Sequence, residues 1–225
     1  MKKYVCDIET NGLRPGYHEI TEISILRCED MVQKVWLLNI KYPKRSSEQA
    51  ITKTGQDLYK ISKRKNYIED VILEINSFIE EDGECPDGRL MIAHSVGFDR
   101  NQIETNWELF KYSFPISYFV DSKEMARKYI KNNLKLGKQS IALDRLLMLF
   151  DIPHETNFHC AEVDVRNTFR LYKFLEKKGI KISEFTKISP KLINDDIKKL
   201  KKKYELTEKD AIDVLEELND FNEEL

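Results

Sequence analysis

Close to its amino terminus the chain reads Val5-Cys6-Asp7-Ile8-Glu9-Thr10-Asn11-Gly12-Leu13. Strand-forming residues followed by Asn11-Gly12, a turn dipeptide, predict a strand that runs into a turn. Alternate residues of a strand point to one face, so the Cα atoms of Asp7 and Glu9 would lie about 6.6 Å apart. Two carboxylates at this spacing repel each other unless a cation lies between them. On its own the segment is more simply an acidic strand end that faces water, and a Mg²⁺ site is the alternative.

The composition indicates a globular chain without a large charge excess. Its 225 residues can form one sizeable domain and an appendage, and 41% hydrophobic residues can fill a core. Charged residues make up 34% but nearly cancel, leaving a net charge of −2, so any contact with nucleic acid requires a local basic patch. The cysteines are widely separated and form no CxxC pair, which predicts free thiols in a reducing compartment. No apolar run approaches the roughly 18 residues of a membrane span, so we expect a soluble, cytoplasmic protein without a membrane partner.

The hydrophobic pattern predicts a mixed α/β fold. Two further strands, 20–26 and 32–40, would follow the first and form an antiparallel meander with it. Two short helices separated at Gly55 come next, and a helix with apolar residues at helical spacing runs from Glu69 to Asp82. The remaining predicted elements are strands 90–93 and 118–120 and helices 98–110, 122 onward, 140–150 and 162–178. The prediction is a five-stranded mixed sheet flanked by helices.

Residues 180–225 differ in composition from the rest of the chain. Lysine is concentrated in 187–203, whereas 205–225 is acidic, and each half has apolar residues at helical spacing. Two helices of opposite charge would pack on each other as a hairpin, which is the interpretation we favour. The alternative is a docking element for a polymerase or another protein partner.

Two further acids lie where an acid needs an explanation. Asp99 stands in the first turn of the helix predicted from Phe98, where the helix dipole favours a negative charge. Asp164 shares a face of the last helix with the apolar positions Ala161, Thr168, Leu171 and Leu175. A carboxylate buried there is costly unless it is paired or binds a metal. His159 precedes Asp164 by five residues and by itself would be a loop or capping histidine.

Three segments taken together resemble the three motifs of the DEDDh exonucleases, the proofreading-type branch of the ribonuclease H-like superfamily. They are Asp7-Ile8-Glu9-Thr10-Asn11-Gly12-Leu13, Ala93-His94-Ser95-Val96-Gly97-Phe98-Asp99 and His159-Cys160-Ala161-Glu162-Val163-Asp164. The motifs occur in the family's order, each on the expected type of element. Asp121 before a helix and the apolar helix 140–150 are also similar to the family's pattern. The resemblance implies a ribonuclease H-like exonuclease domain over 1–179, followed by a helical extension over 180–225.

For chemistry, the resemblance implies a 3′→5′ exonuclease that uses two Mg²⁺ ions, with Mn²⁺ as a substitute. Asp7, Glu9 and Asp164 would hold one ion. Asp7 would be shared with the second ion, which Asp99 would support through water. Two cations about 3.5–4 Å apart can stabilise both the attacking and the leaving oxygen. His159 would act as general base, a role that suits a side chain with an ordinary pKa of about 6.5.

The resemblance also implies contacts to the terminal nucleotide. The candidate substrate-binding residues are Thr10, Asn11, Gly12, Leu13, His94 and Phe98. The backbone at 10–12 would contact the terminal sugar, and Leu13 would wedge against the terminal base unless it is an ordinary turn residue. Asn11 and Ser95 stand where the family often has threonine and asparagine. Neither is a metal ligand, so these departures concern only how the nucleotide is held.

One basic run in the main domain could follow the phosphates of a substrate strand. It consists of Lys123, Arg127, Lys128, Lys131, Lys135 and Lys138. With Tyr129 among these cations, phosphate contacts with occasional base stacking are one explanation, and a solvated helix face is the other. The cluster 198–203 could serve likewise but more simply solvates one helix.

These observations predict a stand-alone, metal-dependent 3′→5′ exonuclease that releases nucleoside 5′-monophosphates from single-stranded nucleic acid. DNA is favoured over RNA, which would suit replication or repair, and a trimmer of RNA ends is the nearest alternative. A catalytically silent adaptor that binds nucleic acid or a polymerase is a third explanation. The presence of all four acids and the histidine argues against it, because a silent copy has no need of a repulsive acid cluster.

Overall fold

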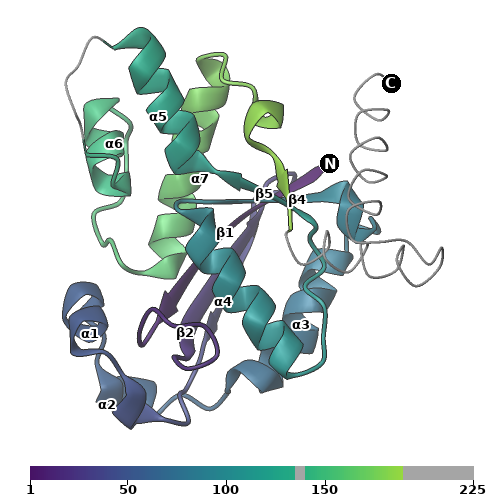
Figure 1. The fold of residues 1–225 in the computed structure, drawn as a ribbon, viewed down its shortest axis with the longest axis vertical. Helices are drawn as coiled ribbons and strands as arrows, with labels where there is room; N and C mark the ends of the chain where they lie inside the picture. The colour runs from purple at the N-terminus through teal and green to yellow at the C-terminus, as the bar shows by residue number, and fades with distance from the viewer. Residues whose placement is uncertain (135–139, 190–225) are drawn as a thin grey trace, which may run out of the picture. The chain divides into compact units, whose positions relative to one another are not determined.

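The structure, a computed structural model, describes residues 1–134 and 140–189 of the chain (Figure 1). The chain divides into two units, Met1–Lys187 and Ile188–Leu225, and the first contains all the motif residues. Most of the predicted extension, with its two helices and the cluster 198–203, lies outside the described residues. No helix within the described ranges has both the length and the hydropathy of a transmembrane segment.

A mixed sheet of six strands in the order β3-β2-β1-β4-β5-β6 carries the motif residues. Its strands are β1 (Lys2–Thr10), β2 (Ile20–Arg27), β3 (Val32–Leu37), β4 (Arg89–Ala93), β5 (Tyr118–Asp121) and β6 (Lys187–Ile188). The β1–β2 and β2–β3 pairs are antiparallel, whereas β1–β4 and β4–β5 are parallel. The predicted mixed sheet and its meander are confirmed. The predicted number of five strands is wrong, because the sixth strand, β6, is too short to leave a sequence pattern. In addition, β3 ends at Leu37 rather than at residue 40.

The helices follow the predicted order. They are α1 (Glu48–Thr54), α2 (Leu58–Ile61), α3 (Ile68–Glu80), α4 (Val96–Leu109), α5 (Ser122–Asn133), α6 (Leu143–Leu149) and α7 (Ala161–Lys177). The predicted break at Gly55 is confirmed, because Gly55 ends α1 in the left-handed conformation with φ of 65°. Two starts differ from the prediction by more than one residue: α4 begins at Val96 rather than 98, and α6 begins at Leu143 rather than 140.

Helices cover both faces of the sheet, so its central strands are apolar on both sides. One core lies between the sheet and helices α3 and α4, and the other lies between the sheet and helices α5, α6 and α7 (Figure 1). Along β1 the side chains alternate, with Tyr4 and Ile8 in the first core and Val5 in the second. Asp7 and Glu9 continue the Val5 side, and α7 packs against β1 and β2. The two acids of β1 therefore lie on the α7 side of the sheet.

Candidate active site

The two acids of β1 open onto a cleft of about 520 Å³. Asp99, in the first turn of α4, and Asp164, in the first turn of α7, line the same cleft. His159, in the loop that precedes α7, lines it as well. Segments more than 150 residues apart in the chain thus bring all five predicted catalytic side chains to one place.

Backbone amides hold two of the acids in position. Asp99 is only 3% exposed, and its Oδ1 accepts a hydrogen bond from the backbone N–H of Ile8 at 3.2 Å. Asp164 is 8% exposed, and its Oδ2 accepts from the backbone N–H of His159 at 2.9 Å. The other carboxylate oxygen of Asp164, Oδ1, is buried without any hydrogen-bond partner. Because an unpaired buried oxygen is costly, this atom is a natural ligand for a cation.

Glu9, His159 and Asp164 each offer one ligand atom, and these atoms all lie within 4.8 Å of one another. Carboxylate oxygens suit Mg²⁺ and Mn²⁺, and imidazole nitrogen suits several transition metals. The residues present therefore fit a divalent cation. His159 is close enough to the two carboxylates either to be a ligand or to take a proton beside one.

Burial dominates the electrostatics of the site. It raises the pKa of Glu9 to about 8, with the charge of Asp164 as a further cause. Burial likewise raises the pKa of Asp99 to about 8 and that of Asp164 to about 6. The pKa of Asp7 is raised well above its usual range by burial and by the charges of Asp99 and Glu9. Burial lowers the pKa of His159, so its imidazole is neutral at neutral pH. A cluster of acids that cannot all ionise without a counter-ion attracts cations.

Two loops that border the cleft adopt left-handed backbone conformations at non-glycine residues. Ser95, just before α4, has φ of 76°, and His159 has φ of 64°. Each backbone N–H donates to a carboxylate: Ser95 to Asp121 Oδ1 at 3.0 Å, and His159 to Asp164 Oδ2 at 2.9 Å. Such conformations cost about 1–3 kcal/mol and persist only where the surroundings hold them. Asp121, which also caps α5 through Lys123 N, therefore shapes the loop beside Asp99.

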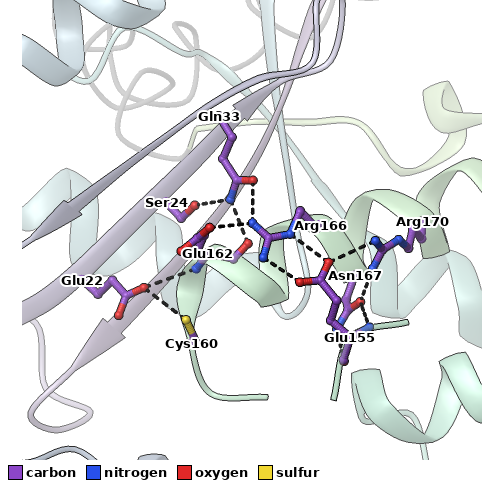
Figure 2. Close-up of polar contacts among 9 residues, drawn as sticks. All are labelled: Glu22, Ser24, Gln33, Glu155, Cys160, Glu162, Arg166, Asn167 and Arg170. Carbon is purple, nitrogen blue, oxygen red and sulfur yellow. Dashed lines mark hydrogen bonds and ion pairs between the residues drawn. The ribbon is translucent and has the colours of Figure 1, made fainter. Parts of the chain in front are cut away.

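A bidentate ion pair anchors the loop that carries His159 (Figure 2). Arg166 of α7 donates to both carboxylate oxygens of Glu155, at 2.9 and 2.7 Å, and Arg170 adds a third bond at 3.0 Å. The backbone N–H of Glu155 donates to Asn167 Oδ1 at 3.1 Å, and Asn167 Nδ2 donates back to the Glu155 carbonyl at 2.9 Å. The loop is thus fixed to the helix that supplies Asp164.

The first turn of α7 is tied to strands β2 and β3 (Figure 2). Gln33 Nε2 donates to Ser24 Oγ and to the Glu162 carbonyl, both at 2.8 Å. Glu22 Oε1 accepts from the backbone N–H of Glu162 at 3.3 Å and from Cys160 Sγ at 3.7 Å. Since Glu22 pairs directly with Glu9 across the β1–β2 ladder, this contact sets the helix against the acids of β1.

A family model described as exonuclease, RNase_T, matches residues 4–172. This chain belongs to that exonuclease family. The predicted membership in an exonuclease family is thereby confirmed, and solved nuclease structures confirm the predicted ribonuclease H-like fold. No curated protein sequence matches the chain.

Solved nuclease structures share the fold at low sequence identity. The nuclease domain of 3′hExo, a DEDDh family member bound to rAMP, aligns with a TM-score of 0.63 and 14% identity, over 84% of this chain and 96% of that one. Exonuclease I of E. coli in complex with a dT13 oligonucleotide aligns with a TM-score of 0.64 and 16% identity, over 80% of this chain and 41% of that one. Cell-death related nuclease 4 aligns with a TM-score of 0.64 and 11% identity, over 80% of this chain and 65% of that one. The exonuclease chain thus spans less than two thirds of two of these three proteins.

Some predicted substrate-binding residues of the exonuclease line the cleft, and others do not. Leu13, which is 71% exposed, and Phe98 border it. Thr10, Asn11 and Gly12 are buried and lie outside its lining. The register of β1 shifts between Glu9 and Thr10, which turns the following residues inward.

The side chain of Asn11 holds the turn together, whereas the contact of the backbone at 10–12 to a terminal sugar stays a prediction. It is fully buried, its Oδ1 accepts from Glu19 N at 2.7 Å, and its Nδ2 donates to Ser46 Oγ at 3.2 Å. Gly12 is required for a similar reason, because a Cβ at this position would lie 2.3 Å from the His18 ring. Both residues thus shape the segment that presents Leu13.

His94 lines the cleft of the exonuclease, but both of its ring nitrogens are engaged within the protein. Nε2 lies 2.9 Å from the Ile141 carbonyl and Nδ1 lies 3.0 Å from Ser122 Oγ. The carbonyl can only accept, so Nε2 carries the proton and Nδ1 accepts from the hydroxyl. His94 therefore positions the start of α5 and the segment before α6.

Several residues that line the cleft were not predicted. They are Ile8, Lys53, Ala142, Leu143, Asp144 and Phe158. Lys53 comes from α1 and Asp144 from α6, two short helices that lie outside the three motifs. Phe158 was detectable only through its place beside His159. Lys123, known from the basic run, also lines the cleft, and its Nζ donates to Ser95 Oγ at 3.0 Å.

The rest of the basic run favours the solvated-face explanation. Arg127 pairs with Glu124, and Lys128 pairs with Glu184. The Tyr129 ring is partly buried in the core beside Phe150 and Phe174, at centroid distances of 5.4 and 5.8 Å, so it serves packing rather than base stacking. Lys135 and Lys138 lie outside the described residues.

Proposed function

We propose that this chain is a divalent-metal-dependent exonuclease that removes nucleoside 5′-monophosphates from single-stranded 3′ ends. The observation that carries the proposal is the buried, unpartnered Oδ1 of Asp164 beside the clustered ligand atoms of Glu9 and His159. Within the part of the chain that the structure describes, no protein group satisfies that oxygen. A bound cation would do so.

The acids would hold two ions, Mg²⁺ or in its place Mn²⁺. Asp7, Glu9 and Asp164 would supply carboxylates for one ion, and Asp7 and Asp99 would support the second; all four acids line the same cleft. When bound, such a pair stabilises negative charge on the attacking and leaving oxygens of an in-line displacement. Without cations the raised pKa values keep part of the cluster protonated, so ion binding and proton release are linked.

His159 would act as the general base. Its neutral imidazole can accept a proton from the attacking water, and its left-handed backbone is held by Asp164. The apolar side chains of Leu13, Phe98 and Phe158 line the same cleft and would bound the terminal base and sugar. Lys53 and Lys123 supply positive charge there for a phosphate.

The proposal is tested by incubating the full chain with matched single- and double-stranded DNA and RNA oligomers, 5′-labelled, with Mg²⁺, Mn²⁺ or EDTA. We expect a ladder of products shortened from the 3′ end, released monophosphates, and no reaction in EDTA. DNA is the favoured substrate. Faster degradation of RNA would support the exoribonuclease alternative, for which the rAMP bound by the 3′hExo domain is a precedent in that protein. Metal-independent or internal cleavage would contradict the proposal.

A further inference from the structure

Four side chains next to Leu13 stack in alternating order, and we call them the Arg–Tyr ladder: Arg14, Tyr17, Arg45 and Tyr42. The guanidinium of Arg14 lies 5.0 Å from the centre of the Tyr17 ring. The guanidinium of Arg45 lies 5.0 Å from the same ring and 3.9 Å from the centre of the Tyr42 ring. Two segments that are distant in sequence thus build one alternating series of flat cations and aromatic rings.

The ladder is exposed and carries uncompensated positive charge. Tyr17 is 42% and Tyr42 is 49% exposed. Across residues 1–134 and 140–189, no ion pair joins Arg14 or Arg45 to a carboxylate. Glu19, the acid nearest in sequence to Tyr17, uses its carboxylate on the backbone N–H groups at 41 and 42. The guanidinium N–H groups are therefore available to an anion.

Local hydrogen bonds hold the backbone of the two segments that carry the ladder. His18 Nδ1 accepts from Arg14 N at 2.9 Å, and His18 N donates to the Arg14 carbonyl at 2.9 Å. The backbone N–H of Arg45 donates to the Tyr42 carbonyl at 2.9 Å. Ser47 N donates to the Asn11 carbonyl at 2.7 Å, which joins the two segments. The backbone of both segments is therefore already ordered for a ligand that binds here, which favours affinity.

The ladder adjoins the cleft. Leu13, which lines the cleft, directly precedes Arg14, and the turn at 43–45 leads into α1, whose Lys53 also lines the cleft. A strand whose terminal nucleotide lies against Leu13 would therefore meet the ladder with the nucleotides that come next. The ladder thus lies outside the cleft but next to it, where the continuing part of a nucleic-acid strand would pass.

We infer that the Arg–Tyr ladder binds the nucleotides adjoining the 3′-terminal one in a single strand, an inference that rests on the proposed function. Tyr42 ends the series with one guanidinium on its ring, so its other face can stack on an unpaired base whatever its identity, and the guanidinium planes bind phosphate or stack on bases. Paired bases are already stacked and offer no faces, so the ladder selects unpaired 3′ ends. It also replaces Tyr129 as the stacking element of the enzyme.

Binding is measured by fluorescence anisotropy in EDTA, with a 5′-labelled single strand of about ten nucleotides and its blunt duplex. Arg45→Gln and Tyr42→Ala are compared with Lys178→Gln, which removes one charge and one cation–ring contact at the far end of α7. We expect each ladder variant to bind the single strand roughly 5- to 100-fold more weakly, as the loss of one stacked base predicts. Arg45→Lys, which keeps the charge but not the plane, should be intermediate, and Lys178→Gln should equal the wild type.

Activity provides the second measurement. The ratio of kcat/KM for the long strand to kcat/KM for a dinucleotide should fall in the ladder variants, because a dinucleotide reaches little of the ladder. Wild-type affinity for the single strand in both Arg45→Gln and Tyr42→Ala would overturn the inference. This surface would then be a candidate binding site for a protein partner instead. If the wild type degrades the strand while the variants match it, only the inference fails. If the wild type shows no metal-dependent trimming at all, the proposed function fails.

Discussion

His159 is the residue whose role has the sharpest test, because its ring atom lies within 4.8 Å of ligand atoms of Glu9 and Asp164. A general base and a metal ligand are both compatible with that distance. We predict that His159→Ala lowers kcat by about 10²–10⁴-fold and leaves metal affinity largely intact. Turnover and calorimetric titration with Mn²⁺ measure the two quantities.

The matched control for this histidine is His154→Ala in the same loop. Its ring hydrogen-bonds to the Ile152 carbonyl at 2.8 Å and does not line the cleft. This variant should lose little activity. A His159→Ala protein that loses affinity for the metal as strongly as it loses turnover would identify His159 as a ligand.

Asp7 lies close to other carboxylates, so its removal should lower activity but raise the stability of the metal-free protein. Asp7→Asn should abolish trimming and also raise the melting temperature in metal-free buffer. The gain arises because the variant removes a carboxylate that burial and the charges of Asp99 and Glu9 disfavour. A protein of this size gains about 2–4 °C per kcal/mol of relieved repulsion, which thermal unfolding in EDTA resolves. Normal turnover in the variant would remove Asp7 from the active site.

At the scale of elements, the loop that precedes α7 depends on Arg166. We predict that Arg166→Gln lowers kcat by about 10- to 100-fold with a smaller change in KM, because the loop no longer holds His159 in place. The pair is partly exposed, so it contributes only about 0–1 kcal/mol to stability, and the melting temperature should change little.

Two further substitutions test whether the bidentate geometry of the Arg166–Glu155 pair matters more than its charge. Arg170→Gln removes one bond to Glu155 instead of two and should have the smaller effect. Arg166→Lys should rescue only part of the activity, since an ammonium cannot make the bidentate contact. A large drop in melting temperature for Arg166→Gln would show a general structural role instead.

The elements that the sequence could predict are those with a long repeating pattern or a strong motif. The meander, the break at Gly55, and α7 with Asp164 on its buried face belong to this class. The start of α4 was missed because it follows the left-handed Ser95, whose backbone N–H is held by Asp121, a contact between residues distant in sequence. Lys53 and Asp144 reach the cleft through tertiary packing of short helices, which no local pattern records. Asn11 faces inward because of the register shift after Glu9, a feature that appears only once β1 and β2 are paired.

At the scale of the whole molecule, the acid cluster makes the stability of the metal-free protein depend on pH. Glu9 and Asp99 have pKa values raised to about 8 in the folded state, so they hold protons there that the unfolded chain releases above pH of about 4. Because the folded state binds more protons, stability falls as the pH rises from about 4 to about 8. Below pH of about 4 a carboxyl with a lowered pKa has the opposite effect. Burial raises the pKa of Asp82, but hydrogen bonds from Arg89 and Tyr4 outweigh it and lower this pKa to about 2. The stability that ionised Asp82 contributes is therefore lost as the pH falls from about 4 to about 2.

We therefore expect thermal unfolding in EDTA to show a maximum in mildly acidic buffer, near pH of about 4–5. Added Mg²⁺ or Mn²⁺ should raise the melting temperature most at the alkaline end of the window, where the ionised acids need it. Asp164→Asn should weaken that response to metal. A metal-free protein whose melting temperature rises steadily up to pH 8 would show that the acids do not form a repulsive cluster.

The alternation along β1 has a consequence for the kinds of genetic change this exonuclease can accept. Val5, Asp7 and Glu9 share one side of the strand, and Tyr4 and Ile8 fill the core on the other. Loss of a single codon upstream of Asp7 would rotate the carboxylates into the layer beneath α4 and turn the Ile8 side chain to the α7 side of the sheet. Single substitutions can therefore change Leu13 or a residue of the ladder without disturbing the strand. A change in the number of residues in β1, in contrast, would disrupt both the fold and the active site.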